Sequence, residues 1–186
     1  MNTFTKELPN YGYIRSIIPK GLLLELRNVE CEVKHKTGLS KKYEKTPKHY
    51  IVPKEKTVNL FPFIHNIIEL YEKKFHYINT IGILNNPRPF SFQEPWVNIQ
   101  KGDEYLAPHT HDGIFAYSIW LKLPTHSMFE FLYPTTIGTR AKETFNLTPK
   151  DEGGILLFPS LLEHSVHPFS GEGTRMSLSG NILFSV

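Results

Sequence analysis

The 186-residue sequence predicts an α+β protein, mainly β, whose N-terminal helices pack on an antiparallel core of jelly-roll type. Helical spacing of apolar residues is confined to the first half of the chain, before Asn85. After Pro95 the pattern changes to short strand-like segments separated by Gly, Pro, Asp and Asn. The composition, 40% hydrophobic and 21% charged, is that of a globular protein. We therefore expect one domain, residues 1–186.

Within that domain, residues 1–94 are expected to be a helical and loop part that packs on the sheet. An opening strand is predicted around Tyr11–Ile17, followed by a helix over Pro19–His35, because apolar residues recur there every three or four positions. A second helix is predicted over Thr57–Ile78, and Pro62 falls in its first turns, where a missing N–H costs little.

Two segments of the N-terminal part are expected to be irregular. Lys34–Lys56 contains eight lysines against two glutamates, a local charge of +6 in a chain of net charge +3. Such a run is most often a solvated loop, so a dedicated nucleic-acid binder is not expected, although this segment offers the one basic stretch that would suit such a partner. Asn85–Pro95 contains three prolines, Pro87, Pro89 and Pro95, and marks the passage into the β part.

Residues 95–186 are expected to form the β core. The clearest alternation is in FAYSIWLKL, where Phe115, Tyr117 and Ile119 share one face and Ala116 and Trp120 share the other. The predicted strands are Trp96–Gln100, Phe115–Leu123, Phe129–Tyr133, Glu143–Leu147, Gly154–Phe158 and Thr174–Phe184.

The sequence also carries information on the compartment. No apolar run approaches the roughly 18 residues of a membrane helix, and the N-terminus does not have the pattern of a secretory signal. One cysteine, Cys31, cannot form an internal disulfide and fits a reducing environment. A cytoplasmic location is therefore expected, with no membrane partner.

Two histidines one residue apart, His109 and His111, form the first candidate site. Side chains at positions i and i+2 of an extended segment point to one face, so both rings can reach one metal ion. Asp112 and Gly113 then predict a tight turn into the next strand, which places the rings at the mouth of the sheet. A third ligand has to come from elsewhere, and the C-terminal segment offers His164.

The C-terminal strand adds a second feature. Arg175, Ser177, Ser179 and Asn181 alternate with apolar residues and fall on one face. A strand with one wet face would have the same pattern. However, an arginine followed at i+2 by a serine can bind a carboxylate through a guanidinium fork and a hydroxyl.

These residues resemble the iron(II)/2-oxoglutarate-dependent dioxygenases, which have a double-stranded β-helix (jelly-roll, cupin-like) fold. More narrowly, the chain is similar to a branch found in bacteria and in phages of marine bacteria, loosely related to prolyl 4-hydroxylases. The resemblance covers the C-terminal half and is carried by Trp96-Val97-Asn98, His109-Thr110-His111, Phe115–Pro124, Phe158-Pro159-Ser160, His164-Ser165-Val166-His167-Pro168 and Arg175–Asn181.

The resemblance implies roles for individual residues. His109 and His164 match the first and the distal histidine ligands of the metal, and Arg175 with Ser177 matches the pair that binds the far carboxylate of 2-oxoglutarate. Asn98 is expected near the metal or the cosubstrate. In one respect this chain differs: the family has a carboxylate where His111 stands. We expect His111 to be the second ligand because it shares parity with His109, and Asp112, displaced by one position, is its rival.

Beyond the site residues, the resemblance implies a hydroxylase that uses Fe(II), 2-oxoglutarate and O2 in the bacterial or phage-infected cell. The substrate stays open among a peptide, a nucleobase and a small metabolite, and so does the oligomeric state. Two alternatives remain: a three-histidine cupin-type metalloenzyme that does not use 2-oxoglutarate, and a non-catalytic jelly-roll binding or structural protein.

Overall fold

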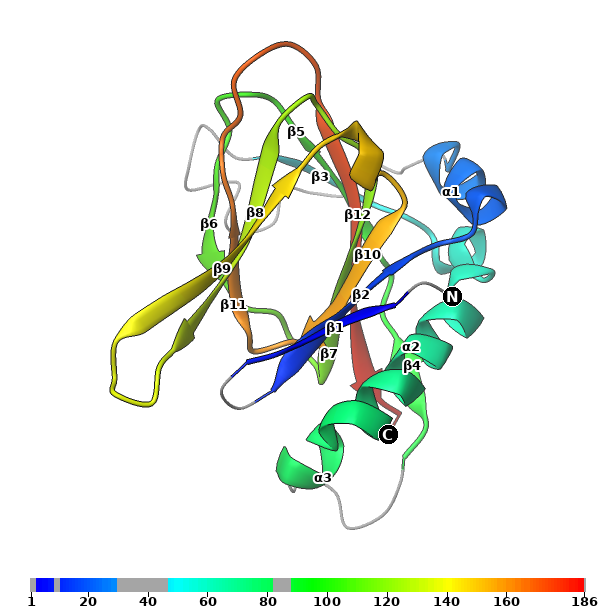
Figure 1. Cartoon of the computed structure of the whole chain (residues 1–186). Coiled ribbons are helices and arrows are strands. Elements are labelled where there is room, and N and C mark those ends of the chain that lie inside the picture. The colour runs from blue at the N-terminus through cyan, green and yellow to red at the C-terminus, as the bar shows by residue number, and fades with distance from the viewer. Residues whose placement is uncertain (1–2, 9–10, 30–46, 82–87, 186) are drawn as a thin grey trace.

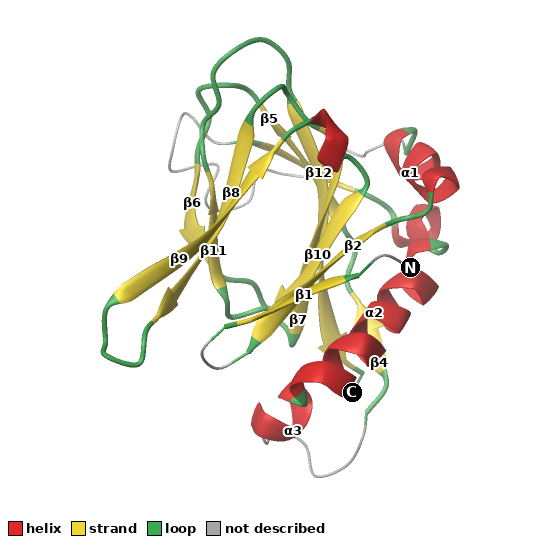
Figure 2. Cartoon of the chain, viewed as in Figure 1, coloured by secondary structure: helices red, strands yellow, loops and turns green. Residues whose placement is uncertain are grey.

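Two antiparallel sheets form the body of the protein, and the helices lie along one side of it (Figures 1 and 2). The computed structural model in Figure 1 describes residues 3–8, 11–29, 47–81 and 88–185. In chain order the elements are β1 (Phe4–Glu7), β2 (Gly12–Ile17), α1 (Lys20–Arg27), β3 (Lys48–Ile51), the 3-10 helix η1 (Lys54–Thr57), α2 (Leu60–Phe75), α3 (Tyr77–Ile81), β4 (Phe90–Phe92), β5 (Trp96–Gln100), β6 (Leu106–His109), β7 (Phe115–Lys122), β8 (Ser127–Pro134), β9 (Arg140–Leu147), the 3-10 helix η2 (Pro149–Asp151), β10 (Gly154–Pro159), β11 (Glu163–Val166) and β12 (Arg175–Phe184).

The larger sheet has eight strands in the order β1-β2-β10-β7-β12-β5-β3, with β4 continuing beside β12 beyond β5. The smaller sheet has the order β6-β11-β8-β9. All pairs are antiparallel, and most connect strands that are distant in sequence. The predicted fold class, a mainly β double-stranded β-helix core with packing helices, is confirmed.

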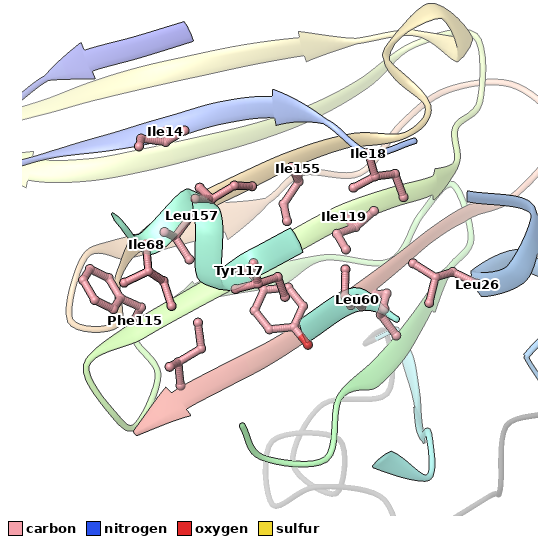
Figure 3. Close-up of a cluster of buried hydrophobic side chains, with 14 of the residues drawn as sticks. Ile14, Ile18, Leu26, Leu60, Ile68, Phe115, Tyr117, Ile119, Ile155 and Leu157 are labelled. Atoms are coloured by element: carbon pink, nitrogen blue, oxygen red, sulfur yellow. The ribbon is translucent and has the colours of Figure 1, made fainter. Parts of the chain in front are cut away.

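The larger sheet is buried on both faces, so two cores form. On the outer face Phe115, Tyr117 and Ile119 of β7 pack against Leu60 and Ile68 of α2 (Figure 3). On the inner face Ala116 and Trp120 pack toward the aromatic residues of the smaller sheet, Phe129, Phe131 and Phe145. The alternation read in the sequence is therefore confirmed, but it separates two apolar cores and not a wet face from a dry one. Trp120, fully buried, is a packing residue.

The helices are shorter than predicted. α1 ends at Arg27, and Asn28 closes its last turn with a 3-10-type hydrogen bond from its N–H to Glu25 O (3.1 Å). The remainder of the predicted helix, up to His35, lies mostly outside the described residues, as does Cys31. α2 ends at Phe75 because His76 adopts a left-handed conformation, φ 49°, and the chain then restarts as α3. Pro62 lies in the first turn of α2, as expected.

Residues 1–94 contain strands as well as helices. Of these strands, only β2 was predicted from the sequence. β3 lies within the lysine-rich segment that was expected to be irregular, and β4 lies within the proline-rich passage. Both are edge strands held by pairing with β5 and β12, contacts that local sequence does not reveal. The basic residues between 34 and 46 lie outside the described residues. Within the described part of the chain, no helix is long and apolar enough to span a membrane.

Candidate metal centre

Three histidines meet between the two sheets. His109 is the last residue of β6, and its Cα pairs across the strands with that of His164 on β11. His111 lies two residues later, and its backbone N–H donates to Ser160 O (2.8 Å). One ring nitrogen from each histidine lies within 4.8 Å of the other two, and the Nε2 atoms of His111 and His164 are 3.1 Å apart. Ligands about 2.1 Å from one ion at adjacent octahedral positions are about 3 Å apart, so this arrangement fits a metal.

The outer ring nitrogens of two of these histidines are held by the backbone. His109 Nδ1 lies 2.7 Å from Ala107 O, and His164 Nδ1 lies 3.0 Å from Leu162 O. In each case the carbonyl accepts the Nδ1–H proton, which leaves the Nε2 lone pair free to bind a metal. The acceptors are the carbonyls two residues earlier, so the strand conformation itself orients these rings.

The protonation of the cluster also suits a metal. Burial lowers the pKa of all three histidines. The pKa of His111 falls to about 3, and that of His164 falls well below its ordinary value. The proximity of His109 lowers the pKa of the other two further. All three rings are therefore neutral at pH 7, the form in which imidazole binds metals. Asp112 is exposed and is not part of this cluster of described residues.

The histidines line a cavity of about 340 Å³. Its floor is the inner face of the larger sheet around β12, β5 and β3, and its other wall comes from β6, β8 and β11. The polar residues that line it, besides the three histidines, are His49, Asn98, Thr110, Asp112, Tyr117, Ser118, Arg175, Ser177, Ser179 and Asn181.

Arg175 brings a buried positive charge to this cavity. Arg175 is 2% exposed, and its Nε has no hydrogen-bond partner. One of its terminal guanidinium nitrogens donates a long hydrogen bond (3.4 Å) to Met128 O. No carboxylate pairs with it among the described residues. Burial lowers the pKa of Arg175 to about 9, so the guanidinium is still charged at pH 7. A buried charge without a counter-charge is costly, which indicates a binding site for an anion.

Ser177 and Asn98 lie on the same wall as Arg175. They are cross-strand partners on β12 and β5. Both line the cavity, because Ser177 shares a strand face with Arg175 and Asn98 shares a strand face with Trp96. Asn98 Nδ2 makes a long hydrogen bond (3.5 Å) to Ser179 Oγ, and Asn98 Oδ1 is buried without a partner. Thus the structure brings His109, His111, His164, Arg175, Ser177 and Asn98 to one cavity.

Two lining residues, His49 and Asn181, were not predicted as site residues. His49 stands on β3 opposite Asn98, in the segment that was expected to be an irregular loop. Burial and the proximity of His109 lower the pKa of His49. Asn181 shares the face of Arg175 and Ser177, so the alternation of β12 carried a signal for it. For His49 no local signal existed, because only the pairing of β3 with β5 brings it to the cavity.

Other histidines lie elsewhere. His167, three residues after His164, leaves the cavity as the strand geometry predicts, and its Nε2 lies 2.8 Å from Glu130 Oε1. This contact lowers the pKa of Glu130 despite the burial of that carboxyl. His65 lies on the exposed side of α2, with its Nδ1 3.5 Å from Glu69 Oε1.

The fold is that of known oxygenases. The epimerase SnoN of nogalamycin biosynthesis matches with a TM-score of 0.62 at 12% identity over 96% of this chain and 80% of its own. A prolyl-4-hydroxylase from Pseudomonas putida matches with 0.60 at 14% over 96% of both chains. The viral collagen prolyl hydroxylase of Paramecium Bursaria Chlorella virus-1 matches with 0.56 at 13% over 94% and 96%. A search of curated protein sequences finds no match.

A family model also matches the sequence. Residues 94–181 match the family model of 2OG-Fe(II) oxygenases, and this range contains every residue of the cluster as well as Arg175. This match covers 88 of the 186 residues, and over this range the chain is similar to the 2OG-Fe(II) oxygenases. It is therefore an oxygenase that depends on iron(II), 2-oxoglutarate and O2, as the resemblance implied. The described residues suit these cofactors, because three neutral imidazoles and an unpaired guanidinium face one cavity.

Proposed function

We propose that His109, His111 and His164 bind the iron(II) of this oxygenase, and that Arg175 and Ser177 bind the far carboxylate of 2-oxoglutarate. The observation that carries the proposal is the buried, unpaired Arg175 in the cavity of the three histidines. Asn98, beside Ser177, adds a polar contact to the same cosubstrate.

The residues of this chain position the reactants and exclude water, and the iron and 2-oxoglutarate supply the oxidation of a C–H bond by O2, with release of succinate and CO2. Arg175 fixes one end of the cosubstrate through charge-assisted hydrogen bonds. The strand β12 fixes the position of Arg175, because Ser177 and Arg175 pair in register with Asn98 and Gln100 of β5.

The three-histidine ligand set has a consequence for charge. The imidazoles are neutral, whereas a set with a carboxylate would neutralise one charge of the ion. Together with the guanidinium of Arg175, the site keeps an excess of positive charge, and the exposed Asp112 is the single acidic residue among the described ones that line it. A dianionic cosubstrate is therefore strongly favoured.

We propose a hydroxylase that acts on a small molecule or a peptide. The relatives in structure include prolyl hydroxylases and the epimerase SnoN from nogalamycin biosynthesis, which supports the two substrate classes without choosing between them. His49, Ile51 and Trp96 form the part of the cavity wall at the β3 edge of the sheet, on the side of Asn98 away from Ser177. This part of the wall is available for substrate. A nucleobase substrate has no supporting contact among the described residues.

We further propose that residues 1–186 act as one domain in the cytoplasm. β2 and β3 of the N-terminal part are hydrogen-bonded into the sheet that carries Arg175, so the two parts share one core. A single cysteine in the sequence fits a reducing compartment.

The ligand assignment is tested by comparing two alanine variants, His111→Ala and Asp112→Ala, for metal binding and for succinate formation from 2-oxoglutarate. Loss of both activities in His111→Ala, with both retained in Asp112→Ala, is the expected result. The opposite pattern would make Asp112 the ligand. A wild-type protein that binds iron but neither binds 2-oxoglutarate nor forms succinate would instead support a three-histidine metalloenzyme that does not use 2-oxoglutarate.

A further inference from the structure

The three histidines differ in how their outer ring nitrogens are held. For His109 and His164 a backbone carbonyl two residues earlier serves as acceptor, at 2.7 Å and 3.0 Å. For His111 no backbone carbonyl among the described residues contacts the ring. A histidine that binds a metal through one nitrogen needs an acceptor for the N–H of the other, because that bond sets both the tautomer and the ring orientation. His111 therefore requires a side chain for this purpose.

Asn181 is in the right place to supply it. The turn after His111 lies against β12 beside Asn181, since Ile114 N–H donates to Ile182 O (2.8 Å). Gly113 approaches the same carbonyl so closely that a Cβ there would lie 2.6 Å from Ile182 O. Asn181 and His111 line the same cavity, and the nearby Asn181 side chain partly offsets the lowering of the His111 pKa by burial.

The orientation of the Asn181 amide is set from its other side. Asn181 Nδ2 donates to Gln93 Oε1 (3.0 Å), and Gln93 N–H donates to Asn181 O (3.1 Å). The donor half of the amide is thus used by Gln93. Asn181 Oδ1 is buried and has no hydrogen-bond partner among the described residues, so it is the acceptor left for the ring of His111.

We infer that Asn181 is a positioning residue whose Oδ1 accepts the outer N–H of His111 and keeps His111 Nε2 directed at the metal. This inference rests on the proposed role of His111 as a ligand. It also accounts for the residue that differs from the family pattern: a carboxylate ligand has no N–H, so an acceptor at position 181 becomes necessary when histidine stands at 111.

The experiment is a double-mutant cycle between positions 111 and 181, with Zn(II) as the probe and affinity measured by chelator competition. Asn181→Leu should weaken Zn(II) binding by about 10–100-fold in the native background. Asn181→Asp, which keeps an acceptor, should restore affinity to within a few-fold. In the His111→Asp background, Asn181→Leu should change affinity by less than about threefold. Equal losses in both backgrounds would overturn the inference, because they would indicate a general structural effect.

A second measurement does not need a metal. Nitrogen-15 spectra of the metal-free protein report the tautomer of each histidine, and His111 should carry its proton on the nitrogen facing Asn181. Asn181→Leu should mix the two tautomers of His111 and leave those of His109 and His164 unchanged. Asn146→Leu, an exposed asparagine on β9 outside the cavity, is the matched control and should change none. An unchanged His111 spectrum in Asn181→Leu would refute the inference.

The two measurements separate this inference from the proposed function. If His111→Ala leaves Zn(II) affinity unchanged while Asn181→Leu still alters the tautomer of His111, the contact exists but His111 is not a ligand, and the proposed ligand set fails. If His111→Ala abolishes binding while Asn181→Leu affects neither the tautomer nor the affinity, the ligand set stands and the positioning role fails.

Discussion

Replacement of Arg175 by methionine should have two opposite effects, weaker cosubstrate binding and a more stable cosubstrate-free protein. Arg175 is 2% exposed, and its guanidinium makes one long hydrogen bond and has no carboxylate partner among the described residues. Burial lowers the pKa of Arg175 to about 9, so the disfavoured charged form dominates at every pH below that value, including pH 7. Each pKa unit corresponds to about 1.4 kcal/mol, so the unpaired charge costs the cosubstrate-free protein a few kcal/mol.

Methionine fills most of the same volume without the charge. Replacing buried ionic groups by apolar ones is commonly neutral or stabilising by about 1–4 kcal/mol. For a protein of this size, a gain of that magnitude raises Tm by roughly 2–16 °C. Removal of one partner of a buried charge pair costs about 2–5 kcal/mol of binding. At about 1.4 kcal/mol per tenfold, the Kd for 2-oxoglutarate should rise by roughly 30-fold to several thousand-fold.

The assay is calorimetric titration of the Zn(II)-loaded protein with 2-oxoglutarate, combined with thermal melting of the cosubstrate-free protein. Arg140→Met is the matched control: Arg140 is exposed, pairs with Glu163 at 2.6 Å and lies outside the cavity, so neither quantity should move. Zn(II) affinity should stay near the wild-type value in both variants. An unchanged Kd for 2-oxoglutarate in Arg175→Met, or a lower Tm, would refute the reasoning.

Four further predictions concern the metal and the core. Because His109, His111 and His164 are neutral at pH 7, Zn(II) binding at pH 7.5 should release no protons from them; a binding enthalpy that varies with the ionisation enthalpy of the buffer would contradict this. Because of the same lowered pKa values, the unfolded chain takes up protons at low pH that the folded chain does not. The stability of the metal-free protein should therefore fall as the pH drops below about 6.5 towards 3. A urea midpoint that stays constant over that pH range would contradict this prediction. Gly113→Ala should weaken Zn(II) binding, since φ is +90° and a Cβ would meet Ile182 O at 2.6 Å; unchanged affinity would show that the turn can shift without moving His111. Trp120→Ala should cost about 3–5 kcal/mol in urea unfolding with the metal ligands intact, and a loss below 1 kcal/mol would contradict its packing role.

Strands with regular alternation were predictable, and strands held by distant partners were not. β5, β7 and β12 carry strong periodic signals and begin within one residue of their predicted positions. β6 and β11 are four residues long, and Pro108 interrupts the pattern of β6. They are strands because His109 and His164 lie opposite each other, a pairing across 55 residues. Although neither β6 nor β11 was predicted, these strands carry two of the three histidines.

The helical boundaries illustrate the same limit. Apolar spacing identified the face of α2 that packs on β7, but it did not reveal that His76 turns left-handed and ends the helix. For α1 the spacing continued past Arg27, where the helix ends. Periodicity reports which side of an element is buried, whereas its end depends on where the chain must turn to reach the next contact.

By itself, the sequence determined the donor chemistry of this protein: the His-x-His pair, the alternation that aims Arg175 and Ser177 to one side of a strand, and the order of motifs that marks an oxygenase. These are local properties, because side-chain parity on a strand follows from covalent geometry. The tertiary structure decided which of those side chains meet. It grouped His111 with His109 and His164 and left Asp112 exposed, and it brought His49 and Asn181 into the cavity. Such neighbours are set by strand pairing and by the burial of two apolar cores, which depend on the whole chain.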